Sequence, residues 1–122
     1  MSVLDNRLRH HRWELDERRR FLAGLETLAS RLRRDAQRLH WEIEQETGAA
    51  HTEQKPGVVY PIFLQPLLER RKKLEGSIVE IETQIAEARE TVATAEQEVS
   101  LCEAAWTHRA TANAAGGRRM RR

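Results

Sequence analysis

The 122-residue sequence contains few of the residues on which compact enzymes and secreted proteins depend. Aromatic residues make up 5% of the chain, which has three prolines and six glycines. The single cysteine, Cys102, excludes an internal disulfide and fits a reducing cytoplasm. No apolar run approaches a membrane span, and charge from Asp5 onward leaves no apolar signal segment. These absences predict a cytoplasmic protein without a thick globular core.

Charge is abundant but unevenly distributed. Charged residues form 33% of the sequence and nearly cancel, to a net charge of +2. The segment from Ser77 to Glu103 holds seven acidic residues and one basic residue, whereas Ala104 to Arg122 holds five arginines and no acid. So small a net charge does not by itself indicate a nucleic-acid-binding protein. We expect the acidic segment to lie against an arginine-bearing partner helix and the basic tail to remain uncompensated.

Apolar residues recur on an alternating four-three spacing in two long segments. A period sustained for this length is typical of a coiled coil. No stretch alternates with a period of two, so no strand is predicted. The predicted fold class is all-α, two long helices in an antiparallel coiled-coil hairpin. The seam comprises Leu4, Leu8, His11, Leu15, Arg18, Leu22, Leu25, Ala29, Leu32, Ala36, Leu39 and Ile43, then Leu64, Leu67, Arg71, Leu74, Ile78, Ile81, Ile85, Ala88, Val92, Ala95, Val99, Cys102 and Trp106.

Local chemistry predicts where the helices begin and end. Ser2 and Asp5 have the spacing of a capping box, and Gly48 is placed to end the first helix. Prolines are acceptable only near a helix start, so the second helix should begin between Pro61 and Pro66. We therefore predict helices over about residues 3–47 and 64–112, a loop over 48–63, and a disordered basic tail over 113–122.

The two seams also predict a register. In an antiparallel hairpin, opposed residues keep a constant sum of residue numbers, which sets Leu25 against Ile85 and each seam alanine against a larger residue. The three polar seam residues should then lay their apolar stems along the seam and keep their polar ends in solvent. On one flank the same rule opposes unlike charges, in the pairs Arg12/Glu103, Arg19/Glu96, Glu26/Arg89 and Arg33/Glu82.

No residue pattern indicates catalysis, a cofactor or a bound metal. The histidines are scattered; His40 has a ligand-like spacing with Glu44, and a solvated surface explains that pair better. A narrow hairpin offers no cleft in which burial could raise a carboxyl pKa. Cys102 falls on the seam, where it acts as a small apolar residue. The sequence predicts a non-enzymatic protein with no small-molecule substrate.

Partner binding is predicted for residues that point away from the seam. Trp13 and Trp41 fall at the outward heptad position, where an aromatic side chain does not help the hairpin. Phe21 and Leu28 share one flank and widen its apolar stripe. The alternative is that these four residues only cover the seam edge. The basic tail is either a solvated end or an electrostatic arm for an acidic partner or nucleic acid, and its residues are Arg118, Arg119, Arg121 and Arg122.

Two stretches resemble the FliJ family, small coiled-coil proteins of the bacterial flagellar type III export apparatus. They are LRHHRWELDERRRFLAGLE, from Leu8 to Glu26, and LERRKKLEGSIVEIETQIAEARE, from Leu68 to Glu90. The resemblance rests on a WxLDExRR-like phrase and an ERRxxLExSIxxIExQIxxAR-like phrase, each in its expected arm. Together the two stretches cover about a third of the chain.

The resemblance implies a cytoplasmic, non-enzymatic stalk or escort protein, peripheral to the inner membrane only through its partners. Those partners would be the hexameric export ATPase, the export gate and export chaperones, with no nucleic acid expected. FliJ proteins are similar to the stalk of rotary ATPases. The two termini would enter the ATPase ring, and the loop end, Lys55 to Pro66, would face the gate or chaperones.

Two other classes of function are kept open. One is a generic coiled-coil adaptor or self-associating scaffold that uses Trp13 and Phe21 to form a four-helix bundle. The other is a binder of nucleic acid or a membrane surface, driven by the basic tail.

Overall fold

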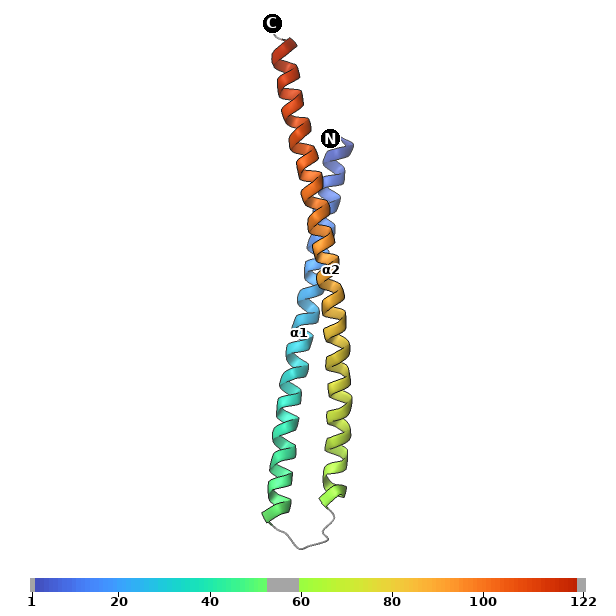
Figure 1. Ribbon diagram of the computed structural model, residues 1–122, viewed down its shortest axis with the longest axis vertical. Helices are drawn as coiled ribbons and strands as arrows, with labels where there is room; N and C mark the ends of the chain where they lie inside the picture. Colours follow the sequence, from blue (N-terminus) through green and yellow to red (C-terminus); the bar gives the residue numbers. More distant parts are fainter. Residues whose placement is uncertain (1, 53–59, 121–122) are drawn as a thin grey trace. The chain divides into compact units, whose positions relative to one another are not determined.

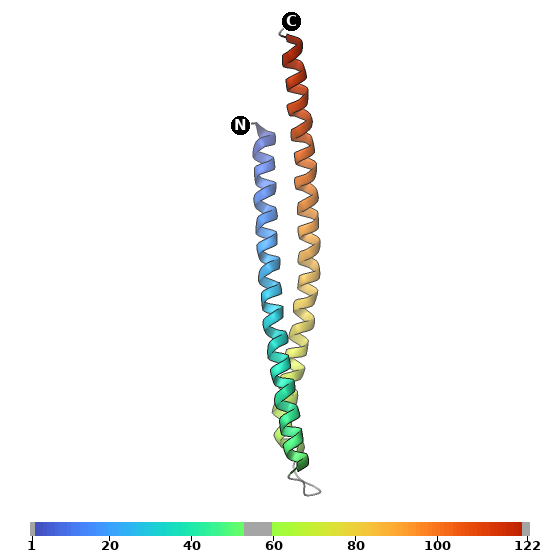
Figure 2. The same ribbon diagram turned by 90° about the vertical axis from the view of Figure 1, so that its left-hand side faces the viewer.

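The protein is an antiparallel pair of long helices. The computed structural model describes residues 2–52 and 60–120, with side chains for residues 2–48 and 64–116. Helix α1 spans Val3–Thr52 and helix α2 spans Tyr60–Met120, and no strand occurs in these two described ranges. Figures 1 and 2 show the two helices side by side in perpendicular views. The predicted all-α helical hairpin is confirmed.

The chain divides into two compact units, and each contains a segment of both helices. The first unit, called the terminal unit here, combines residues 2–23, which include the first part of α1, with residues 86–120 of α2. The second, called the middle unit, comprises Gly24–Ile85. Each unit therefore has its own antiparallel helix pair.

The buried residues confirm the predicted seam. Every side chain classed as buried in the described part of the chain is a predicted seam residue. In the terminal unit, Leu4 and Leu22 pack against a cluster of Leu8, Leu15, Val92, Ala95, Val99 and Cys102. In the middle unit, Leu67 and Leu74 pack against Leu39, Ile43 and Leu64.

The two arginines of the seam keep their charged groups near solvent, as predicted, whereas the third polar seam residue, His11, keeps its Nδ1 atom buried. Arg18 extends to Glu14, with 3.5 Å between a guanidinium nitrogen and a carboxylate oxygen. Arg71 lies 3.9 Å from Glu75 in the same way. Both arginines therefore contribute their aliphatic stems to the seam while the charge finds a carboxylate on its own helix.

Charged pairs on one flank support the predicted register. Their nitrogen–oxygen distances are 3.3 Å, 3.4 Å and 3.2 Å, and all lie at exposed positions. Exposed ion pairs add little stability, about 0 to 1 kcal/mol each, so they report the register rather than create it. The pairs formed are Arg12–Glu103 and Arg19–Glu96 in the terminal unit and Arg33–Glu82 in the middle unit. The fourth predicted pair, Glu26 with Arg89, has one residue in each unit.

The start of α1 is the predicted capping box. The Ser2 backbone N–H donates to an Asp5 carboxylate oxygen at 3.0 Å, and the Asp5 backbone N–H donates to the Ser2 hydroxyl at 3.1 Å. The Ser2 hydroxyl also donates to the Asp5 carboxylate at 2.8 Å. These reciprocal bonds satisfy amide groups that the first helical turn leaves without intrahelical partners.

The predicted end of the first helix was wrong. Gly48 does not end α1, which continues to Thr52, and its backbone avoids the left-handed conformation that a glycine cap adopts. Two alanines follow it, and alanine has the strongest intrinsic helix propensity. Within the predicted loop, residues 48–52 and 60–63 are helical, and residues 53–59 lie outside the described residues.

The second helix is also longer than predicted at both ends. It begins at Tyr60, so Pro61 lies in its first turn and Pro66 lies inside it. Leu64, just before Pro66, is buried in the middle-unit cluster, and this packing can offset the hydrogen bond that a helical proline removes. The predicted tail over 113–122 is helical to Met120, because an alanine-rich stretch precedes the glycines. Residues 121–122 lie outside the described residues.

Candidate docking surfaces

The aromatic side chains of Trp13 and Phe21, in the terminal unit, are exposed, as expected for residues outside the seam. Trp13 is 60% exposed and Phe21 is 62% exposed. The Trp13 ring stacks on the His10 ring with centroids 6.1 Å apart and an interplanar angle of 25°. This contact covers part of one face of the indole and leaves most of the side chain exposed.

Trp106 differs from its sequence interpretation as a seam residue. It is 44% exposed, and its indole N–H donates a 2.7 Å hydrogen bond to the Asp5 carboxylate. The bond joins α2 to the capping box of α1 in the terminal unit. A heptad position indicates only the direction of a side chain. The sequence therefore could not predict that the Trp106 indole would donate a hydrogen bond to Asp5.

A hollow of about 400 Å³ lies beside this hydrogen bond. Its walls are Asp5, Leu8, Arg9, Arg12 and Trp106. Its lining combines two apolar side chains, Leu8 and Trp106, with two arginines and the Asp5 carboxylate. Sequence analysis overlooked this surface because its residues come from two segments about a hundred residues apart.

The Asp5 carboxylate carries a pH-dependent part of the stability of the terminal unit. The backbone hydrogen bond from Ser2 is the largest cause that lowers the pKa of Asp5, followed by the Ser2 hydroxyl and the Trp106 indole. A lowered pKa in the folded state means that this stabilisation is present above the ordinary carboxyl range, about pH 4, and is lost as the pH falls through the folded value.

We expect Asp5→Asn to lower the thermal midpoint at neutral pH and to remove part of the loss of stability seen below about pH 4. Trp106→Phe, which keeps the ring and removes the donor, should show a smaller change of the same sign. Thermal unfolding followed by circular dichroism between pH 2.5 and 7 measures both effects. An acid profile of Asp5→Asn that parallels the wild type would contradict this role.

The middle unit has its own exposed apolar residues. Trp41 is 60% exposed, the same fraction as Trp13, and Leu28 is exposed too. Both were predicted to lie outside the seam, and the structure places them there. The two predicted docking residues of this unit therefore remain available to a partner.

The predicted arginine arm is only partly described. Arg118 and Arg119 belong to α2, which ends at Met120, but their side chains lie outside the described residues. Arg121 and Arg122 lie outside them entirely. The electrostatic role of these four arginines remains a prediction.

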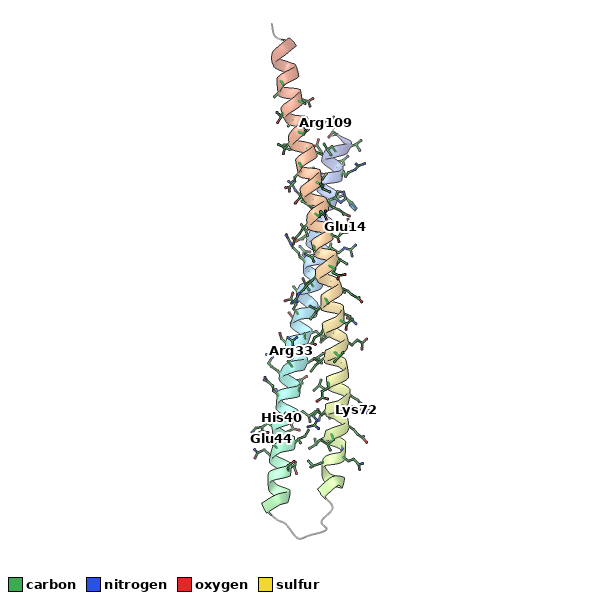
Figure 3. The ribbon with its side chains drawn as sticks, in the orientation of Figure 1. Glu14, Arg33, His40, Glu44, Lys72 and Arg109 are labelled. Atoms are coloured by element: carbon green, nitrogen blue, oxygen red, sulfur yellow. The ribbon has the colours of Figure 1, made fainter. Side chains whose placement is uncertain are left out.

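The histidine predicted to lie on a solvated surface does so. His40 Nε2 lies 3.0 Å from Glu44 Oε1, one turn further along α1, and both side chains are well exposed (Figure 3). The structure also brings His11 and Glu14 of α1 close to Glu98 of α2. Sequence analysis missed this cluster, although the His11 and Glu14 spacing was a visible signal. Cys102 is buried, as predicted for a seam residue.

Comparison with known protein families, with curated proteins and with solved structures finds no match for this chain. Across the described residues, neither helix has a stretch long and apolar enough to cross a membrane.

Proposed function

We propose that the protein is a non-enzymatic component of the bacterial flagellar type III export apparatus, a helical stalk or escort that docks on the export ATPase. The observation that carries the proposal is the pair of exposed aromatic residues, Trp13 and Phe21, on the terminal unit. Both lie within the first of the two stretches similar to FliJ proteins. The hexameric ATPase, the export gate and export chaperones are the proposed partners.

Physical features of the terminal unit favour a protein partner. An exposed tryptophan gives a large contact area at low entropic cost, and tryptophans are over-represented among the residues that dominate binding energy. Arginines flank Trp13 in the sequence, with Arg12 directly before it and Arg18, Arg19 and Arg20 following. A docking surface with an aromatic centre and charged surroundings agrees with a regulated, reversible contact.

Affinity capture from the native host tests the proposal. The full-length protein serves as bait, and the captured proteins are identified by mass spectrometry. We expect recovery of an export ATPase or an export-gate component. Capture of neither component by a well-folded bait would refute the proposal.

A matched pair of variants locates the docking surface. Trp13→Ala and Trp41→Ala remove the same side chain at the same exposure from different units. Because the resemblance directs the termini to the ATPase ring, Trp13→Ala should weaken ATPase capture at least tenfold, as loss of an interface hot spot does. Trp41→Ala should leave it within about twofold. The reverse order would move the docking surface to the middle unit.

Self-association is the second candidate, and the same exposed aromatics favour it. Two copies could cover Trp13 and Phe21 in a four-helix bundle, making the protein a coiled-coil adaptor or scaffold. Sedimentation equilibrium separates the two candidates. A monomer at micromolar concentration supports the stalk, whereas a stable dimer that Trp13→Ala dissociates supports the scaffold.

A further inference from the structure

Three metal-ligating side chains of the terminal unit converge across the helix pair. His11 and Glu14 lie three residues apart on α1, and Glu98 approaches them from α2. The His11 Nδ1 atom lies 3.4 Å from a Glu98 carboxylate oxygen and 4.0 Å from a Glu14 carboxylate oxygen. All three ligand atoms lie within 4.8 Å of one another. Di-iron and di-manganese helix bundles combine a Glu and a His three residues apart on one helix with a carboxylate from a facing helix, in the order Glu-x-x-His; here the same spacing occurs in the reverse order.

The His11 nitrogen at the centre of this cluster is an orphan. Nδ1 is buried and has no hydrogen-bond partner, although the His11 side chain as a whole is 23% exposed. Its separation from Glu98 is longer than the roughly 2.9 Å of an ordinary N–H···O bond. Two carboxylates and an imidazole nitrogen surround one point, and a cation there would satisfy all three groups.

The distances suit a small cation with tetrahedral preference. Zn²⁺ binds imidazole nitrogen and carboxylate oxygen at about 2.0–2.2 Å, so neighbouring ligand atoms in its tetrahedron lie about 3.4 Å apart. The separation of His11 and Glu98 matches this value. Glu14 needs a small rotation to complete the set. Its other carboxylate oxygen lies 3.5 Å from Arg18, which can orient the carboxylate toward the cation.

The surroundings of the cluster attract cations. A hollow of about 370 Å³ beside it is lined by Glu14 and Glu98 and by two further carboxylates, Glu87 and Glu90, with Arg18 as the lining base. An excess of negative charge in a concave surface raises the local concentration of positive ions. His10 also lies near, with Nε2 3.9 Å from the Glu14 oxygen that faces His11.

We propose that His11, Glu14 and Glu98 form a binding site for a zinc-type divalent cation that links α1 to α2 in the terminal unit. One imidazole with two carboxylates suits Zn²⁺ better than Ca²⁺ or Mg²⁺, which take oxygen ligands. Three protein ligands leave a fourth position for water or for a side chain of a partner. Because the ligands come from both helices, bound metal stabilises the folded pair. The site is independent of the proposed export function.

Metal titration of the full-length, tag-free protein tests this site. We expect Zn²⁺ to bind with one equivalent in calorimetry and to raise the thermal midpoint. Co²⁺, used as a spectroscopic probe, should give the intense visible absorption of tetrahedral coordination. Glu98→Gln preserves the size of an exposed side chain and should weaken Zn²⁺ binding at least tenfold, since even a residue that only orients a ligand is worth ten- to a hundredfold.

Glu44→Gln is the matched control. It makes the same substitution in the exposed His40–Glu44 pair, whose two residues lie on one helix, and should retain the wild-type affinity. His11→Ala, checked for helicity by circular dichroism, should lose binding as Glu98→Gln does. The site is refuted if Zn²⁺ does not bind, if Glu98→Gln binds as tightly as the wild type, or if Glu44→Gln weakens binding equally.

Discussion

Leu15→Ala is expected to lower the free energy of unfolding by about 2 to 4 kcal/mol. Leu15 is 7% exposed and belongs to the cluster that joins α1 to α2 in the terminal unit. Its removal deletes buried apolar surface and leaves a cavity that a seam with two helices cannot fill from a second layer. Proteins of this size are stable by about 5 to 15 kcal/mol in total, so the loss is a large fraction.

The control for this substitution is Leu101→Ala. Leu101 belongs to the same unit but is 64% exposed, and substitutions at exposed positions usually change stability by about 0.5 kcal/mol or less. Urea denaturation followed by circular dichroism measures both variants. Equal losses for Leu15→Ala and Leu101→Ala would contradict the assignment of the seam.

The double substitution of Gly24 and Gly76 by alanine is expected to raise the free energy of unfolding by about 1.5 to 2 kcal/mol. Both glycines lie inside the helices of the middle unit, and neither has the left-handed backbone conformation that would strain an alanine. A Cβ atom built at either position meets nothing within 4 Å. The gain arises because alanine has fewer unfolded conformations to lose and a stronger helix propensity.

Thermal and urea denaturation should show this gain as a higher midpoint with an unchanged urea dependence of the unfolding free energy. The reverse substitution at an exposed helical position, Ala86→Gly, supplies the control and should lower stability by about 1 kcal/mol. Destabilisation by the two alanines would contradict this prediction, because it would mean that the added Cβ atoms clash with neighbouring groups.

Replacing an exposed aromatic residue should affect partner binding without affecting the stability of the fold. Trp13 and Trp41 contribute little to the seam, so their replacement by alanine should not unfold the protein. Any loss of partner capture in Trp13→Ala can then be assigned to the surface rather than to the fold. The buried seam does not permit this separation, since Leu15 supports both the fold and whatever the fold presents.

The proposed zinc site would make the stability of the terminal unit depend on the concentration of the cation. A cation held by His11, Glu14 and Glu98 would join α1 to α2 beside the exposed Trp13. Partner docking and metal binding would then act on the same helix pair. Because each ligand of the folded state stabilises it by mass action, occupancy of the site would stabilise the helix pair of the terminal unit against unfolding.

Much of the fold follows from local pattern. The heptad spacing identified the seam, since the direction of a side chain on a helix depends only on its position along the chain. The register followed as well, because charge complementarity along one flank distinguishes the correct offset, and Arg19 indeed meets Glu96. The capping box of Ser2 and Asp5 needed no tertiary information for the same reason.

Tertiary structure decided the features that depend on a neighbour. Pro66 lies inside α2, against its local preference, because buried packing at Leu64 outweighs a single unfavourable residue. The Trp106–Asp5 hydrogen bond and the approach of Glu98 to His11 and Glu14 join residues far apart in the chain. Periodicity shows which face a residue occupies, whereas only the paired helices show which polar groups meet on it.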